Sequence, residues 1–300
     1  MARGVTHSAS VSSGTVVAKR PASPLMRDIA RAARHPMFAA GFVVFASVLV
    51  LAIFADAIAP HSYREIDLKR ALSPPGGEFI FGTDQYGRCL YSRVIYGTRI
   101  ALRVGLIVVT IQSAIGVSLG LIAGYFGGVL DRVICFVTDV TWALPPLVFA
   151  MAIVMAMGPS LDNVIIAIAV VSWAQMARVV RSKTQSVKSL PFVEAARALG
   201  RSDAGIILKH ILPNVLSPII VLATLSLPSA ILSTTALSFL GLGSQPPAPD
   251  WGVMLNEGIN YIEIAPWISI FPGIAIVWTV LGFNLLGVGL RDVLDPRLKT

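Results

Sequence analysis

Six long runs of apolar residues divide the chain, and short polar stretches separate them. A helix that crosses a bilayer needs about 20 mostly apolar residues, and each run meets or approaches that length. The runs cover residues 38–59, 100–125, 133–157, 162–180, 215–240 and 266–289. The pattern therefore predicts an all-α integral membrane protein with six transmembrane helices.

Composition agrees with this fold class. The chain has 300 residues, of which 55% are hydrophobic and only 13% are charged, whereas soluble domains average about 25% charged residues. Its formal net charge of +8 fits basic cytoplasmic loops, so we expect no nucleic-acid partner. Cys89 and Cys135 fall in different layers of the predicted topology and lack metal-ligand spacing, so neither a disulfide nor a metal site is expected.

The distribution of Lys and Arg predicts the orientation. Six lie before the first apolar run and seven lie in the loop 178–212, but none lies in the loop 241–265. Because basic residues collect on the cytoplasmic side, both termini and the loop 178–212 are predicted to be cytoplasmic. The loop 60–99 opposes this assignment, since it must lie outside yet carries six basic residues; reversing the orientation would break the rule at every other loop.

These assignments predict four regions. Residues 1–37 form a cytoplasmic N-terminal tail without a secretory signal, and 38–99 form the first transmembrane helix plus an external loop. Residues 100–290 form the transmembrane core with a cytoplasmic loop at 178–213, and 291–300 form a cytoplasmic tail. Within the external loop, a turn-rich piece precedes an amphipathic helix, whose basic residues are expected to reach lipid head groups; these are Arg88, Arg93, Arg99 and Arg103.

The loop 178–213 has a helix–glycine–helix pattern. Ser189 is a candidate cap for the first helix, and Gly200 is expected to break it. Asp203 is a candidate cap for a second helix that is expected to end before Pro213. An apolar face of the first helix follows from the spacing of Phe192, Ala195, Ala196 and Leu199. The pattern alone fits equally a knob that docks in a partner's groove and a helix resting on lipid.

A resemblance favours the docking knob. Glu194-Ala195-Ala196, then Gly200, then His210-Ile211-Leu212-Pro213 resemble the EAA signature of ABC-importer permeases, with its full spacing. The one departure is His210, where the general pattern has Ile. The resemblance implies that this segment couples the chain to a cytoplasmic ATPase through Glu194, Ala195, Ala196, Gly200, His210, Leu212 and Pro213.

Three further segments are similar to permeases of the dipeptide and oligopeptide type. They are "FGTDQYGRCLYSRVIYGTRIAL", "GYFGGVLDRVICFVTDVTWALPPLVFAMAI" and "ALSFLGLGSQPPAPDWGVML". Cys89 and Cys135-Phe136 depart from the usual Asp and Met-Arg. The resemblance covers residues 27–297 and is to the second permease subunit of such an importer. It implies an ABC type I importer (MetI-like) core in a bacterial cell membrane that forms half of a translocation pathway.

The same resemblance implies the partners. They are a homologous second permease subunit, two ABC ATPase subunits that bind ATP and Mg, an extracytoplasmic substrate-binding protein, and membrane lipid. The cargo is expected to be a short peptide, with nickel, haem or glycans as alternatives.

The residues themselves limit the rival classes. The chain has no Gly-x-x-x-x-Gly-Lys-Ser/Thr loop, so we expect no ATPase site of its own, and no cofactor or enzymatic activity. An intramembrane enzyme is disfavoured because none of the four His lies at mid-membrane depth. An ion-coupled secondary transporter remains the rival, although it would need more acids inside the spans and inverted repeats.

Two further sets of site residues are predicted. Asp139 is the only acid deep in a run, where ionisable groups tend to be functional, although a structural pairing with the partner permease is an equal alternative. The predicted pathway set is Asp139, Trp142, Pro145, Gln175 and Asn284. The double proline Pro145-Pro146 is expected to disrupt the helical hydrogen-bond ladder of its span. The outer loops 60–99 and 241–265 are predicted to receive the binding protein, and the exposed candidates for this docking are Trp251, Glu257 and Glu263.

Overall fold

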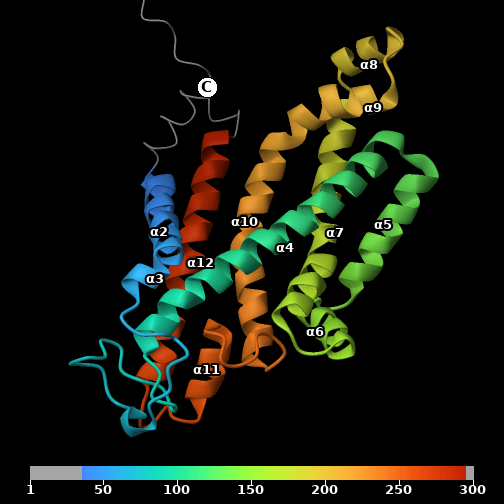
Figure 1. Cartoon of the computed structure of the whole chain (residues 1–300). Helices are drawn as coiled ribbons and strands as arrows, with labels where there is room; N and C mark the ends of the chain where they lie inside the picture. The colour runs from blue at the N-terminus through green and yellow to red at the C-terminus, as the bar shows by residue number, and fades with distance from the viewer. Residues whose placement is uncertain (1–35, 295–300) are drawn as a thin grey trace, which may run out of the picture.

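The computed structural model describes residues 36–294, so the predictions for 1–35 and 295–300 lie outside the described residues. The described part is helical and has no strand, which confirms the fold class (Figure 1). Five helices are long and apolar enough to cross a membrane, or six if one bent pair counts as a single span. The elements are α2 (Pro36–Ile53), α3 (Ala55–Ile58), η1 (Leu68–Arg70), α4 (Leu90–Phe126), α5 (Gly128–Ala143), α6 (Pro146–Met157), α7 (Leu161–Lys188), α8 (Pro191–Ala198), α9 (Asp203–Ile206), η2 (Ile207–Ile211), α10 (Leu212–Phe239), α11 (Trp251–Ile259) and α12 (Trp267–Leu294).

The second span is much longer than its apolar run. The predicted amphipathic helix and the run 100–125 are one continuous helix, α4, of 37 residues. At about 1.5 Å per residue it is ~55 Å long, well beyond the roughly 30 Å hydrocarbon core of a bilayer. Accordingly, α4 crosses the bundle obliquely (Figure 1).

The third span is broken rather than straight. Helices α5 and α6, which cover the predicted span 133–157, meet at an angle of 89°. The expected disruption by the two prolines is confirmed: Pro145 is the N-cap of α6 and Pro146 is its first residue. Proline lacks an N–H and fits the first turn of a helix but not its interior.

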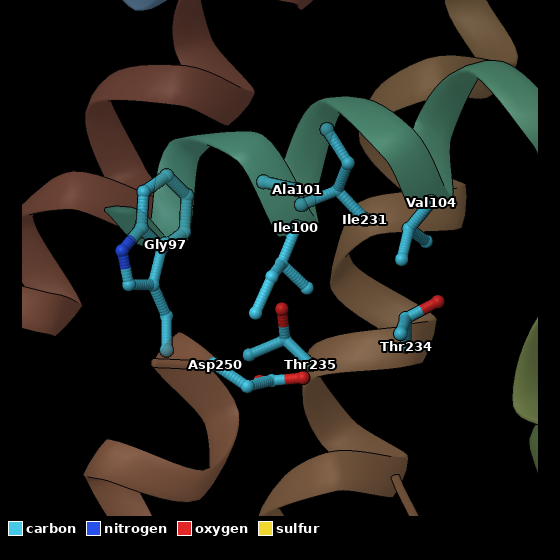
Figure 2. Close-up of a pocket in the computed structure, with 9 residues that line it drawn as sticks. Gly97, Ile100, Ala101, Val104, Ile231, Thr234, Thr235 and Asp250 are labelled. Atoms are coloured by element: carbon cyan, nitrogen blue, oxygen red, sulfur yellow. The ribbon is translucent and has the colours of Figure 1, made fainter. Parts of the chain in front are cut away.

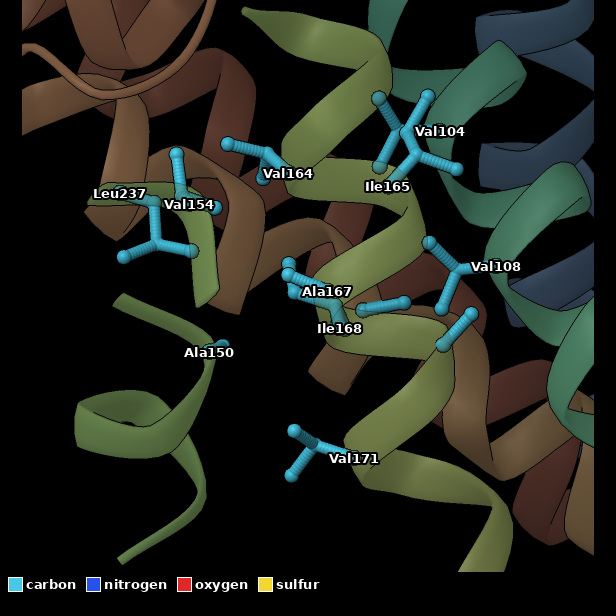
Figure 3. Close-up of a cluster of buried hydrophobic side chains, with 12 residues drawn as sticks. Val104, Val108, Ala150, Val154, Val164, Ile165, Ala167, Ile168, Val171 and Leu237 are labelled. Atoms are coloured by element: carbon cyan, nitrogen blue, oxygen red, sulfur yellow. The ribbon is translucent and has the colours of Figure 1, made fainter. Parts of the chain in front are cut away.

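Helix α7 is the centre of the bundle and contacts α4, α5, α6, α8 and α10. In the first part of α7 the buried residues are β-branched or small, and they pack against residues of three neighbouring helices (Figure 3). The cluster comprises Val104 and Val108 of α4, Ala150 and Val154 of α6, Ala230 and Leu237 of α10, and Val164, Ile165, Ala167, Ile168, Ala169 and Val171 of α7. Because lipid supplies no hydrophobic force between helices, such close packing holds them together.

A row of three glycines brings α4 against α7. A Cβ atom at Gly116, Gly120 or Gly124 would lie 2.6 Å from Met176 Cβ, the Ala177 carbonyl oxygen and Thr184 Cβ, respectively. The spacing of four residues keeps all three glycines on one face of α4. This small-residue seam lets the two backbones approach.

The bundle has two distinct ends (Figure 1). Helices α8 and α9 project at one end, toward which the start of α2 and the end of α12 also lie. Helix α11 and the segment between α3 and α4 cover the opposite end. The former is called the knob end and the latter the loop end. Helix α2 packs mainly on α12, at the edge of the bundle.

Candidate functional site

A knob formed by residues 190–211 projects from the bundle, and its underside is anchored in apolar contacts. Val193 of α8 and Ile206 of α9 are completely buried, and Ala196 is nearly so. They pack in one cluster with Val180 of α7 and Ile211 at the base of the knob. The knob is therefore fixed to the bundle rather than attached by a loose loop.

Polar contacts with the end of α4 reinforce this anchor. The Tyr125 hydroxyl donates to the Asp203 carboxylate of α9, and the Lys188 ammonium donates to the Tyr125 carbonyl. The Arg197 guanidinium lies 5.8 Å from the centre of the Tyr125 ring. A force on the knob would therefore reach α4 and α7 together.

The outward surface of the knob is apolar with one acid. Leu199 is 87% exposed, and Phe192 is also exposed, as is Glu194. The predicted apolar face is thus divided: Phe192, Ala195 and Leu199 point outward, whereas Ala196 points inward with Val193. An exposed apolar surface flanked by charge is suited to a protein partner.

Gly200 ends the first helix of the knob, as predicted. Its φ of +75° lies in the left-handed region, which glycine adopts without steric cost. The amides of Gly200 and Arg201 donate to the carbonyls of Arg197 and Ala196, which satisfies the last turn of α8.

Two expectations about the second helix are wrong. Ser202, not Asp203, is its N-cap and accepts from the Gly205 amide. The helix also does not end before Pro213, because a π-helical turn at Ile207–Ile211 carries it into α10. The wider turn accommodates the proline, and the Asn214 side-chain amide donates to the His210 carbonyl at 2.6 Å. Of the remaining predicted coupling residues, His210 and Leu212 are half-buried and Pro213 is exposed.

A polar face on α5 and α7 brings together two of the predicted pathway residues. The Arg178 guanidinium of α7 lies 2.7 Å from the Asp139 carboxylate and 4.8 Å from the centre of the Trp142 ring. Arg181 and Asp131 form a second pair between the same helices. The Asp139 and Arg178 side chains are 67% and 48% exposed. A charged pair in a spanning segment is costly against lipid, so this face suits a watery pathway or a partner subunit.

The remaining predicted pathway residues are dispersed. Gln175 is exposed on α7, one turn from Arg178, and Pro145 lies at the bend between α5 and α6. Asn284 is exposed on α12, which packs on α2, α10 and α11 and not on the helices that carry Asp139 and Arg178.

A buried charge cluster ties the loop end together. Arg88 Nε lies 2.6 Å from an Asp84 oxygen, and Arg88 and Arg93 each lie 3.0 Å from Glu257 Oε2 of α11. Arg93 also pairs with Asp84. Arg93 and Asp84 are fully buried and Arg88 is 2% exposed. The expectation that Arg88 and Arg93 reach head groups is therefore wrong, because the two carboxylates hold them inside the protein.

Of two residues predicted to be exposed for docking, one is buried and the other is largely buried. Trp251 is 4% exposed, and its indole N–H donates to the Val94 carbonyl at 3.0 Å. Its ring fits because Gly97 has no side chain: a Cβ there would lie 2.2 Å from the indole nitrogen. Figure 2 shows Asp250, next to Trp251, beneath this part of α4. Glu257 is held in the charge cluster, so the exposure expected of Trp251 and Glu257 is wrong; Glu263 is exposed.

Sequence reasoning missed the partners in these arrangements. No local pattern links Arg88 to Glu257, which lie 169 residues apart. The glycine seam of α4 could have been found, because its four-residue spacing in an apolar run is a known packing signal.

Comparison with known proteins relates this architecture to transport proteins. Residues 116–300 match the family described as "Binding-protein-dependent transport system inner membrane component". Residues 23–75 match the "N-terminal TM domain of oligopeptide transport permease C". The second match covers the first span, and the first covers most of the core and the knob.

Individual relatives are similar over most of the chain. A dipeptide transport system permease protein of Alkalihalophilus pseudofirmus is 44% identical over 93% of this chain and 91% of its own length. Glutathione transport system permease proteins of Pectobacterium atrosepticum and Escherichia coli are 42% and 46% identical. These cover 89% and 88% of this chain, and 89% and 86% of their own lengths.

Proposed function

The chain belongs to the family of binding-protein-dependent transport system inner membrane components, and from this we propose that it is a membrane subunit of an ATP-driven importer of short peptides. The observation that carries the proposal is its similarity, over nine-tenths of its length, to a dipeptide transport permease. Relatives named for glutathione support the same class, since glutathione is itself a short peptide.

The subunit forms half of a translocation pathway and pairs with a homologous permease. The exposed polar face of Asp139, Arg178 and Trp142 supports this arrangement, because it needs water or a partner at membrane depth. Gln175 extends this face, and Pro145 shapes its end by bending α5 against α6. Asn284 on α12 belongs to the pathway only if the partner subunit brings the two surfaces together.

The knob couples the subunit to cytoplasmic ATPases, which bind ATP and Mg. Its outward apolar residues and Glu194 contact the ATPase, while Val193 and Tyr125 transmit the motion to the long helices. Closure of the ATPases on ATP then tilts α4, α7 and α10 and alternates access to the pathway. The rigid anchor of the knob supports this role.

The knob end faces the cytoplasm of a bacterial cell, and the loop end faces an extracytoplasmic substrate-binding protein. The basic residues of the knob and its flanks support this orientation. Glu263 is the exposed candidate for docking of the binding protein. The six basic residues of the loop 60–99 are the exception to this rule; two of them, Arg88 and Arg93, are paired in the buried charge cluster.

Reconstitution of the complete importer tests the proposal against its rivals. The chain, a homologous permease and two ATPases should purify together, and vesicles containing them should take up a labelled dipeptide only with ATP and the binding protein. Uptake driven by an ion gradient without an ATPase would establish a secondary transporter instead. Uptake of nickel, haem or a glycan but of no peptide would correct the cargo.

Substitutions in the knob test the coupling role. Glu194→Lys and Gly200→Leu should each lower substrate-stimulated ATP hydrolysis and transport by about tenfold while the bundle stays folded. Glu65→Lys is the matched charge control at the loop end. Gly77→Leu is the matched strain control, since Gly77 also has a positive φ and nothing within 4 Å. Full activity of both knob variants would disprove the role.

A further inference from the structure

A hollow opens at the loop end between α4, the start of α7 and the loop that follows α10. Its volume is about 560 Å³, within the range of about 300–1,000 Å³ that is usual for small-ligand sites. It is lined by residues of α4 and the start of α7, and also by the segment before α4 and the loop 244–249, which lie outside the spanning helices. It is therefore accessible from the aqueous side.

The lining of this hollow is cationic. Arg64, Arg99 and Arg103 line it, and none of the lining residues is acidic. Arg99 lies 2.9 Å from Asp56, and Arg103 lies 2.9 Å from Asp162. Each of these two arginines is therefore already paired with an acid that does not line the hollow.

Arg64 is the unbalanced charge. Its Nε donates to the Tyr63 hydroxyl at 2.9 Å, and its guanidinium lies 5.2 Å from the centre of the Tyr63 ring. No carboxylate within the described residues 36–294 lies within ion-pair distance of it. A guanidinium held against an aromatic ring keeps free N–H groups that suit the two oxygens of a carboxylate.

The remaining wall adds positive potential and apolar surface. Helix α7 begins at Leu161 on the hollow, and the positive end of its dipole favours an anion there. Tyr96 and Pro247 supply apolar surface, and Gln245 supplies an amide. This combination fits a small amphipathic molecule with an anionic end.

We propose that this hollow binds the free C-terminal carboxylate of a short peptide at the outer mouth of the pathway, with Arg64 as the principal contact. The inference rests on the proposed function, because it assigns a site for the cargo of that importer. A peptide is favoured over a phospholipid because Tyr63, Arg64 and the loop 244–249 form the part of the wall that lies outside the spanning helices, next to residues of α4 and the start of α7.

The test compares uptake of one dipeptide with a free carboxylate and the same dipeptide as its C-terminal amide. The complete importer is used in vesicles, with the binding protein saturated by each peptide. The wild type should import the free acid about tenfold faster. Arg64→Gln should bring the ratio of the two rates close to one, and Arg64→Lys should retain part of the preference. The binding protein is common to all variants, so a change in this ratio belongs to the permease.

Two further variants test whether the effect belongs to the charge inside the hollow. Lys69→Gln removes an equivalent exposed charge at the same end but outside the hollow, and it should leave the ratio unchanged. Gln245→Glu places a negative charge inside the hollow and should lower the ratio without altering Arg64.

The possible results distinguish failure of this inference from failure of the proposed function. A wild-type ratio of one, or a preference that survives Arg64→Gln and Gln245→Glu, would overturn the inference and leave peptide import intact. An equal loss for both peptides would also overturn it and indicate a contact with the binding protein or lipid. If the wild-type importer takes up neither peptide with ATP, the proposed function itself fails.

Discussion

At the scale of single residues, the most consequential feature is the burial of paired charges at the loop end. Arg93 is fully buried beside Asp84 and Glu257, and Arg88 pairs with the same two carboxylates. Moving charges out of water costs several kcal/mol per ion unless they are paired and hydrogen-bonded. The cluster is thus a structural requirement of the loop end.

Neutralising one carboxylate of this cluster should destabilise the protein. Asp84→Asn leaves Arg88 and Arg93 with only Glu257, at a cost of about 3–5 kcal/mol. The thermal unfolding midpoint of the purified complex should fall by roughly 10 °C. Glu65→Gln is the control, because Glu65 is exposed and makes no ion pair within the described residues. An unchanged midpoint for Asp84→Asn would contradict the role assigned to the pair.

The exposed pair of Asp139 and Arg178 has a different expected behaviour. If it lines the pathway, Asp139→Ala should lower transport about tenfold while the complex still assembles. A purely structural pairing predicts instead that assembly itself is lost. The charge-swapped double variant, Asp139→Arg with Arg178→Asp, should restore a structural pair but not a transport site. Co-purification and uptake, measured together, distinguish the two.

At the scale of the elements, close backbone approach and helix bends determine the shape of the core. The glycine seam of α4 positions α7, and the Pro145-Pro146 pair turns α6 across the end of α5. The π-turn below the knob lets one helical path run from Asp203 to Phe239 despite Pro213. The knob is therefore joined to the bundle by a continuous helix, as the proposed coupling role requires.

The seam should not tolerate a larger side chain. A valine at Gly120 would place atoms against the Ala177 carbonyl, and overpacking of this kind costs about 1–3 kcal/mol. Gly120→Val should therefore lower the yield of assembled complex and its thermal midpoint. Gly273→Val is the matched control, since Gly273 is also helical and has nothing within 4 Å. Equal tolerance of both substitutions would mean that the seam is not a packing constraint.

At the scale of the whole molecule, the two ends of the bundle carry different chemistry. The knob end presents apolar surface and basic residues, whereas the loop end holds the charge cluster, α11 and the hollow around Arg64. A transporter needs such polarity, since it must receive cargo on one side and energy on the other.

Surface labelling of intact cells should reveal this polarity. In a background of Cys89→Ser and Cys135→Ser, a cysteine at Leu68 (69% exposed) should react with a membrane-impermeant maleimide. A cysteine at Leu199 (87% exposed) should react only after the membrane is opened. The reverse pattern would invert the orientation and make the loop 60–99 cytoplasmic.

The sequence by itself determined the features that depend on local spacing. Apolar run lengths gave the helical class and the approximate spans, and the positions of Gly200 and of Pro145-Pro146 gave the two breaks. The spacing from Glu194 to Pro213 gave the family resemblance that the comparisons confirm. These properties survive without tertiary contacts, because dihedral preferences and the 20-residue membrane requirement act within one segment.

Only the tertiary structure decided which polar residues are buried and which face outward. Arg93, Trp251 and Glu257 look like exposed groups in the sequence, but each has a hydrogen-bond partner distant along the chain. Arg64, by contrast, was one basic residue among six in its loop, and the fold leaves it as the unpaired charge of a hollow. A charge is buried at low cost only where an opposite charge lies within hydrogen-bond distance. Local sequence patterns do not show which distant residues the fold brings that close.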